Sequence, residues 1–291
     1  MTDHGRRTFA GELPRTDFPA TATVVDRIGS FIRDRVAAAD ASGVVVAMSG
    51  GLDSTVSAAL AADALGADRV FGLALPCHKT DATAAAEAGA LAESLGIEFE
   101  RVHLRPLVHQ FRQTVVPALA ADDGGPAPTV DRAVGNAVAR FRTVCTYYAA
   151  NRRDRLVLGT ANRSERLLGY VTKHGDAADL QPLGDLYKTE VREVADYLGV
   201  PEEVVEAPPS AGRSPGQTDA DDLGATYDVV DPFLRRVVDD RVPVDAALDG
   251  LALDRETAGR LHAMCRATAH KRAVAPTPGV VDRPSRPFAP E

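Results

Sequence analysis

The chain has 291 residues, a length that corresponds to one or two domains at about 150 residues each. Hydrophobic residues make up 45% of the sequence and charged residues 25%, which is typical of globular proteins and excludes wholesale disorder. The formal net charge of -8 argues against a nucleic-acid-binding surface. Since no run of about 18 apolar residues occurs, no membrane span is expected. The three cysteines are widely separated, which favours a reducing, cytoplasmic location.

The first half of the chain alternates between helical and strand patterns. Residues 1–21 are polar and contain prolines, which predicts an irregular N-terminal arm. The apolar run at 44–48 predicts a strand that is buried on both faces. The other predicted elements are helix 22–41, helix 54–65, strand 70–75, helix 81–95, strand 97–104 and a helix that ends near residue 121.

The second half contains one more strand and is otherwise helix and loop. The predicted elements are loop 122–129, helix 131–150, strand 156–158, loop 159–185, helix 189–198, mobile loop 208–222, helices up to 272 and a proline-rich tail at 273–291. Strands that alternate with helices predict an α/β fold, with a doubly wound parallel sheet, helices on both faces and additional C-terminal helices. Residues 22–272 are therefore expected to form one main domain.

The most informative segment is Ser49-Gly50-Gly51-Leu52-Asp53-Ser54, which separates the first predicted strand from the next helix. In a parallel sheet this turn lies at the carboxyl edge, where ligands bind. Glycines allow main-chain amides to approach an anion, and the helix N-terminus adds further donors. The spacing differs from that of a Walker loop. Asp53 within a phosphate cradle suggests Mg²⁺, although a plain turn with Asp53 as a helix cap is the alternative interpretation.

The pattern Ser-Gly-Gly-x-Asp-Ser resembles the pyrophosphatase (PP) loop of the ATP pyrophosphatase superfamily. Its members cleave ATP between the α- and β-phosphates and adenylate an acyl or similar oxygen. Several families of synthetases share this loop, so the resemblance defines the chemistry and leaves the substrate open.

Motifs in the second half indicate one of these families. Residues 135–142 (GNAVARFR) and 159–165 (GTANRSE) are similar to two signature segments of NAD synthetases. Further matches lie at 169–173, 175–176, 182–189, 208–211, 215–219 and 270–272. The matches run in family order from about residue 22 to residue 272. Segment 175–179 departs from the family pattern, because it is one residue shorter and lacks two glycines.

The resemblance implies a fold of the adenine nucleotide alpha hydrolase type and a two-step amidation. The carboxylate of deamido-NAD attacks the α-phosphorus of ATP, pyrophosphate leaves, and ammonia then displaces AMP to give NAD, the last step of NAD biosynthesis. It also implies a homodimer with the substrate site near the interface. Because no segment is left for a glutaminase domain, free ammonia is the expected nitrogen donor. The alternatives are another PP-loop adenylating amidotransferase, a tRNA-modifying ligase, or a silent nucleotide-binding subunit.

The same resemblance assigns roles to individual residues. ATP contacts are expected from Ala47, Met48, Ser49, Gly50, Gly51, Leu52, Asp53, Ser54, Thr160, Lys188 and Ser210. Deamido-NAD contacts are expected from Arg140, Lys173, Asp179, His270 and Lys271. Asp53 and Glu165 are expected to hold Mg²⁺. The expected catalytic residues are Asp53, Lys188 and Asp176, the last of which would take a proton from ammonium.

Overall fold

The structure is a computed structural model that describes residues 19–77, 81–119, 130–210 and 217–276. Four predicted segments lie wholly or partly outside these residues. They are most of the N-terminal arm, loop 122–129, the middle of loop 208–222 and the tail beyond residue 276. None of the described helices combines the length and apolar composition that a membrane crossing requires.

A parallel sheet forms the centre of the described structure. Its strands are β1 (Gly43–Ala47), β2 (Val70–Ala74), β3 (Glu98–Arg101) and β4 (Arg155–Leu158). They lie in the order β3-β2-β1-β4, and every neighbouring pair is parallel. Strands β2 and β3 are therefore added in turn on one side of β1, and β4 lies on the other side of β1. Such a switch point opens a crevice at the carboxyl ends of the two strands.

Both faces of the sheet are covered, as the apolar run of β1 predicts. Val44 and Val46 point into one core and Val45 into the other, because successive side chains of a strand alternate. The first core contains α1 (Thr21–Ala38), α2 (Leu52–Leu65), α3 (Asp81–Ser94), α7 (Lys188–Leu198) and α8 (Glu202–Val205). The second contains α4 (Arg105–Ala118) and α5 (Val130–Arg153). All three valines are fully buried.

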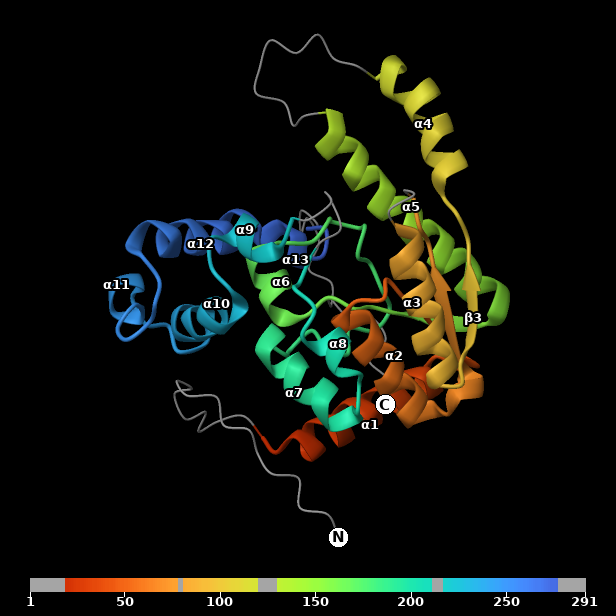
Figure 1. Cartoon of the computed structure of the whole chain (residues 1–291), viewed down its shortest axis with the longest axis horizontal. Coiled ribbons are helices and arrows are strands. Elements are labelled where there is room, and N and C mark those ends of the chain that lie inside the picture. Colours follow the sequence, from red (N-terminus) through yellow and green to blue (C-terminus); the bar gives the residue numbers. More distant parts are fainter. Residues whose placement is uncertain (1–18, 78–80, 120–129, 211–216, 277–291) are drawn as a thin grey trace, which may run out of the picture.

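The C-terminal helices form a third core beside the sheet, on the left of Figure 1. Phe233, Leu234 and Leu261 are fully buried in it. Its elements are α6 (Arg163–Leu168), α9 (Asp219–Leu223), α10 (Tyr227–Leu234), the π-helical turn η2 (Arg235–Asp239), α11 (Val244–Ala247), α12 (Arg255–Ala267) and α13 (Ala269–Arg272). A 3-10 turn, η1 (Ala67–Arg69), precedes β2. The C-terminal helices pack against α6 and α7, which carry predicted site residues.

The predicted fold class is confirmed, and the differences concern single elements. The stretch 159–185, predicted to be loop, contains the six-residue helix α6. Its N-terminus is stabilised by a capping box in which the side chains of Asn162 and Glu165 each bond to the other residue's backbone N–H. Strand β3 is shorter than predicted, and α2 begins two residues earlier, at Leu52. The end of the predicted loop 208–222 is helical, because α9 begins at Asp219.

Candidate active site

The loop after β1 has the geometry that its glycines predict. Gly50 has a φ of +84°, and a Cβ there would lie 2.7 Å from the carbonyl oxygen of Ala84 on α3. A side chain would thus face both backbone strain and a steric clash. Ser54 Oγ donates a hydrogen bond to Gly51 O at 3.0 Å and accepts one from Ser49 N at 3.2 Å. The loop is a compact turn that brings its amides to the start of α2.

A cluster of two carboxylates and one ammonium lies beside this loop. Asp53 comes from the first turn of α2, Glu165 from α6, and Lys188 is the first residue of α7. Lys188 Nζ forms an ion pair with Asp53 and lies 3.6 Å from Glu165 Oε1. The exposed fractions of these side chains are 5% for Lys188, 16% for Asp53 and 17% for Glu165. The three residues predicted to be metal ligands or catalytic at this edge are therefore brought together.

Asn162 connects the two carboxylates, although it was not among the predicted site residues. Its Nδ2 donates to Asp53 Oδ1 at 3.0 Å, and its Oδ1 accepts from Glu165 N at 3.0 Å. Glu165 Oε2 in turn accepts from the backbone N of Asn162 at 3.3 Å. The sequence contains a signal for this residue, since Asn followed by Glu three positions later is the spacing of a capping box. Asn162 is fully buried and orients both acids.

The protonation of the cluster follows from its burial and its charges. Burial and the Asp53 carboxylate raise the pKa of Glu165 to about 8, although the Lys188 ammonium opposes this shift. Burial alone would lower the pKa of Lys188, but Asp53 and Glu165 outweigh it and raise that pKa above its ordinary value. Lys188 is therefore a permanent cation. An additional cation would favour ionisation of both carboxylates, and the cluster would then have one excess negative charge to balance it.

The donor set also fits Mg²⁺ held jointly with a phosphate. Asp53 and Glu165 direct oxygens at a common point, which the Lys188 ammonium marks in this structure. Among the described residues no three His, Cys, Asp or Glu side chains are close enough to form a metal cage of their own. Mg²⁺ needs no such cage, because it is commonly bound by one or two carboxylates together with substrate phosphates.

A buried carboxylate from the C-terminal helices braces α6 and α7 under the cluster. Asp231 on α10 accepts from Ser164 Oγ at 2.6 Å and from Thr189 N at 2.9 Å, and Ser164 Oγ accepts from Lys188 N at 3.0 Å. Asp231 is 3% exposed. Burial raises the pKa of this carboxyl group to about 6, although its hydrogen bonds with Ser164 and Thr189 favour the charged form. This network fixes the backbone beside Glu165 and Lys188.

Tyr187 provides a second support for the start of α7. Its backbone N donates to Glu190 Oε2 at 2.8 Å, and its hydroxyl group donates to Asp239 Oδ2 at 2.8 Å. The guanidinium groups of Arg163 and Arg235 lie 5.4 Å and 5.5 Å from its ring centre. Two of these partners, Arg235 and Asp239, belong to the π-helical turn η2, a conformation that is frequent near functional sites.

The remaining predicted ATP contacts lie on segments around the cluster. Thr160 is half-buried between β4 and α6. Ser210 is exposed, and its Oγ donates to Gln217 O at 2.8 Å. Asp219 N donates to Pro209 O at 2.8 Å, so two hydrogen bonds join the ends of the segment that carries Ser210. Asp219 itself is 3% exposed and was not predicted to be part of the site.

Most residues predicted to contact deamido-NAD lie on or beside the segment 169–179, which is joined to two helices. Thr172 Oγ1 donates to Asn136 Oδ1 on α5 at 3.0 Å. Lys271 Nζ on α13 donates to Gly169 O at 2.6 Å and to Val171 O at 2.8 Å. Helix α5 also carries Arg140, α13 carries His270, and the segment carries Lys173. Arg140 and His270 are exposed, whereas Lys173 is half-buried.

The two acids of this segment have defined backbone partners. Asp176 is exposed, and its Oδ2 accepts from Thr172 N at 2.7 Å. Asp179 accepts from Val157 N at 2.7 Å and from Tyr147 OH at 3.2 Å. Burial and the Asp179 charge raise the pKa of Tyr147 to about 12, so its hydroxyl group remains a donor. The geometry therefore gives Asp179 a part in attaching the segment to β4.

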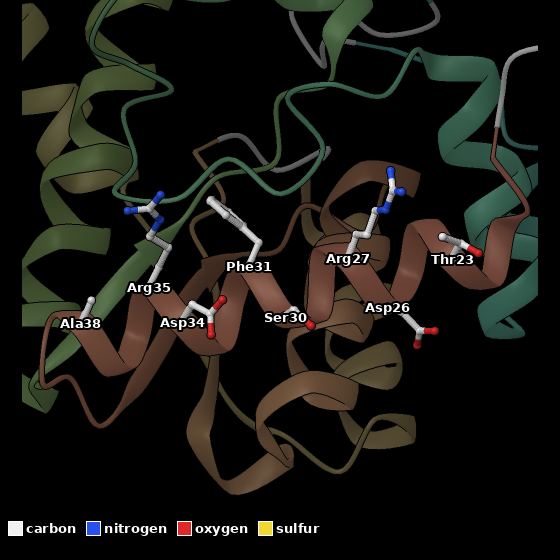
Figure 2. A pocket seen from close by; sticks show the side chains of 8 residues that line it. All are labelled: Thr23, Asp26, Arg27, Ser30, Phe31, Asp34, Arg35 and Ala38. Carbon is white, nitrogen blue, oxygen red and sulfur yellow. The ribbon is translucent and has the colours of Figure 1, made fainter. Parts of the chain in front are cut away.

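A broad depression lies elsewhere, along the outer side of α1. Figure 2 shows Arg27, Phe31 and Arg35 in line along it, with Asp26 and Asp34 nearby. Acidic and basic groups alternate there, so no single ligand charge is favoured. None of the predicted site residues lines this depression. The site is therefore defined by the chemistry at the end of β1 and not by the depression.

The fold and the cluster define an α/β protein with a parallel sheet and a buried charged site at the end of its first strand. The sequence pattern of the NAD synthase family matches residues 24–275. The chain belongs to this family.

Individual relatives agree with this assignment. The chain is 44% identical to an NH(3)-dependent NAD(+) synthetase of Halobacterium salinarum, over 87% of this chain and 91% of that protein. Its identity to the protein of the same name from Methanocaldococcus jannaschii is 40%, over 88% and 96%. Among solved structures it is similar to an NMN synthetase from Francisella tularensis (TM-score 0.75, 31% identity, 90% of this chain and 99% of that chain). The NH3-dependent NAD synthetase from Campylobacter jejuni is also similar (TM-score 0.71, 25% identity, 89% and 99%).

Proposed function

We propose that the protein makes NAD by ATP-dependent amidation of deamido-NAD with ammonia, with release of AMP and pyrophosphate. The observation that carries the proposal is the cluster of Asp53, Glu165 and Lys188 beside the glycine loop. The names of the relatives from Halobacterium and Methanocaldococcus support both the product and the nitrogen donor.

The reaction explains why the site is built around phosphate charge. A carboxylate resists attack by ammonia, because oxide would have to leave. Adenylation replaces oxide with AMP, so the first step needs a bound triphosphate whose α-phosphorus meets the substrate carboxylate. Positioning and charge neutralisation then account for most of the catalysis. We propose that Ser49, Gly50, Gly51 and Ser54 bind the phosphates and that Lys188 neutralises the leaving pyrophosphate; the compact turn of the loop supports this.

We further propose that Mg²⁺ is bound by Asp53 and Glu165 together with the ATP phosphates. The metal would supply neutralisation of the triphosphate charge during adenylation. Asn162 holds both acids in place by its hydrogen bonds to Asp53 and Glu165. The buried Asp231 network joins α6 and α7 to α10 and so supports the backbone beside Glu165 and Lys188.

The dinucleotide is proposed to bind along α5, segment 169–179 and α13. Arg140, Lys173 and His270 provide groups suited to its pyrophosphate and carboxylate, and Lys271 organises the segment through two carbonyl oxygens. Asp176 is the proposed acceptor for the proton that ammonium must lose. It is exposed, so ammonium from solvent can reach it.

A direct assay tests this function against related activities that use another nitrogen donor or another acid substrate. The purified protein is supplied with ATP, Mg²⁺, ammonium and deamido-NAD, and the formation of NAD and AMP is followed. We expect equal amounts of both products, and no reaction when glutamine replaces ammonium. Because one similar structure is an NMN synthetase, the mononucleotide acid is tested as a competing substrate. Faster turnover of the mononucleotide, or no NAD at all, would contradict the proposal.

We also propose that the protein acts as a homodimer through its α4/α5 side, which projects at the top of Figure 1. Large apolar side chains are exposed there, including Leu107 (45%), Val144 (65%) and Tyr148 (68%). Isolated exposed apolar residues are ordinary, but several on two adjacent helices indicate an interface. We expect Val144→Asp to produce monomers in light-scattering chromatography, whereas Tyr197→Ser on α7 does not. A wild-type monomer would refute the proposal.

The cytoplasm remains the proposed location. Cys77, Cys145 and Cys265 are all free thiols, and two of them are buried. Burial raises the pKa of Cys265 to about 11, which keeps it an unreactive thiol. Cell fractionation of a tagged protein tests this location, and recovery of the protein outside the cytoplasm would contradict it.

A further inference from the structure

Lys188 occupies the point at which the two acids meet. Its Nζ forms an ion pair with Asp53 and lies 3.6 Å from Glu165 Oε1. The side chain is 5% exposed, so water screens these charges only slightly. In the nucleotide-free protein, the ammonium group is therefore the direct partner of Asp53 and the near neighbour of Glu165.

The same carboxylate oxygens are the ones a divalent metal would use. Mg²⁺ binds oxygen at about 2.0–2.1 Å and tolerates little distortion of its octahedron. An ammonium group that stays in contact with Asp53 would repel the metal at short range in a poorly screened site. Lys188 and a metal ion therefore cannot both occupy this point. One cation has to move before the other can bind.

We propose that Lys188 blocks the metal site of the nucleotide-free protein, so that the divalent ion enters only together with ATP. The triphosphate offers the ammonium group new anionic partners, and its departure frees Asp53 and Glu165 for the metal. This inference rests on the proposed function and adds an order of binding to it. It also predicts that the free protein has little affinity for the metal alone.

The surrounding structure allows the ammonium group to move while its backbone stays fixed. Lys188 N is held by Ser164 Oγ at 3.0 Å, and Thr189 N by Asp231 Oδ2 at 2.9 Å. The lysine side chain has a flexible four-carbon stem and three donors that can be redirected. On one side it faces the ring of Tyr227, whose centre lies 5.7 Å from Nζ. A change of side-chain rotamer would move the ammonium group while the backbone of α7 stays in place.

The test measures Mn²⁺ binding by electron paramagnetic resonance in the absence of nucleotide. Lys188→Met removes the charge and keeps a side chain of similar length. We expect this variant to bind Mn²⁺ about tenfold or more tightly than wild type, because the competing cation is gone. Lys188→Arg keeps a positive charge and should bind as weakly as wild type. Arg192→Met, a matched loss of one cation from the same helix outside the cluster, should also leave binding unchanged.

A second series locates the bound ion. Asp53→Asn in the Lys188→Met background should abolish the gain, because it removes a proposed ligand. Equal Mn²⁺ affinity in wild type and Lys188→Met would overturn the inference, as would a gain that survives Asp53→Asn. Circular dichroism checks the fold of each variant, and Lys188→Gln replaces Lys188→Met if the latter fails to fold. These measurements do not depend on turnover, so they are separable from a failure of the NAD assay.

Discussion

The two sides of the candidate site differ in how firmly the protein holds them. On the phosphate side, Asp53, Glu165 and Lys188 are at most 17% exposed and are linked to one another. On the dinucleotide side, Arg140 and His270 are exposed and belong to a helix surface and a four-residue helix. In the proposed complex, the charges around the triphosphate are thus arranged before the substrate binds, whereas the groups proposed to recognise the dinucleotide are exposed to solvent.

Two lysines make the contrast concrete. Only four of the 33 basic residues are lysine, and both Lys188 and Lys271 lie in predicted site motifs. Lys188 contacts carboxylates that are proposed to change partners during the reaction. Lys271 donates to the carbonyl oxygens of Gly169 and Val171 and so shapes the segment on which the dinucleotide is proposed to lie. The phosphate side uses its lysine as a charge, and the dinucleotide side uses its lysine as a structural donor.

The largest effect is expected from Asp53→Asn. The amide keeps the size of the side chain but cannot balance the Lys188 ammonium or serve as a strong metal ligand. We expect turnover to fall by at least about 10²-fold, the scale of losing one electrostatic group at a transition state. Steady-state NAD formation measures the loss, and thermal unfolding shows that the fold persists. Asp63→Asn, an exposed change on the same helix, should retain activity. Near-normal turnover of the Asp53 variant would refute a preorganised phosphate side.

A smaller effect is expected from Asp231→Asn, which tests the brace under that side. The folded pKa of Asp231 is about 6, above the ordinary value of 3.8, so the folded protein holds this proton more tightly than the unfolded chain. Its contribution to stability is therefore full below about pH 4 and is lost as the pH rises through about 6. The change is of order 2–3 kcal/mol in the free energy of unfolding.

Urea unfolding at several pH values measures this contribution. The Asn variant cannot titrate, so it should lose the decline in stability between about pH 4 and about pH 6. At about pH 4 it should also be less stable by about 1–3 kcal/mol, because Thr189 N or Ser164 Oγ loses an acceptor. This difference should shrink as the pH rises, since only the wild-type protein loses stability. Asp228→Asn on the same helix, where the side chain is 67% exposed, serves as the control. An unchanged pH profile for Asp231→Asn would show that this carboxyl group does not titrate as described.

The sheet could be predicted from the sequence because the patterns that indicate its strands are local. The apolar run at 44–48 required burial on both faces, and Val44, Val45 and Val46 satisfy it from opposite sides. The loop that follows this strand could be predicted from its glycines and its position at the end of a strand. The short helix α6 was missed because six residues carry too little periodicity, and its capping box is the clearer signal.

The brace could not be predicted from the sequence in the same way. Ser164 and Asp231 are 67 residues apart, and no sequence pattern around Asp231 indicates that it accepts a hydrogen bond from Ser164. The same holds for Tyr187 and Asp239, which are 52 residues apart. Residues that contact a ligand follow strand ends and recognisable motifs. The residues that hold them in place depend on how distant helices pack, which one sequence does not reveal.

The smallest effect is expected on the dinucleotide side, from Arg140→Ala. Its guanidinium group is exposed, and NH1 has one long hydrogen bond, to Asn136 O at 3.4 Å. We expect the KM for deamido-NAD to rise by about tenfold, the scale of one charge-assisted contact, with the KM for ATP unchanged. Arg152→Ala, an exposed change on the same helix, should alter neither constant. If instead kcat falls with both KM values unchanged, Arg140 acts in the transition state, and the two sides are equally preorganised.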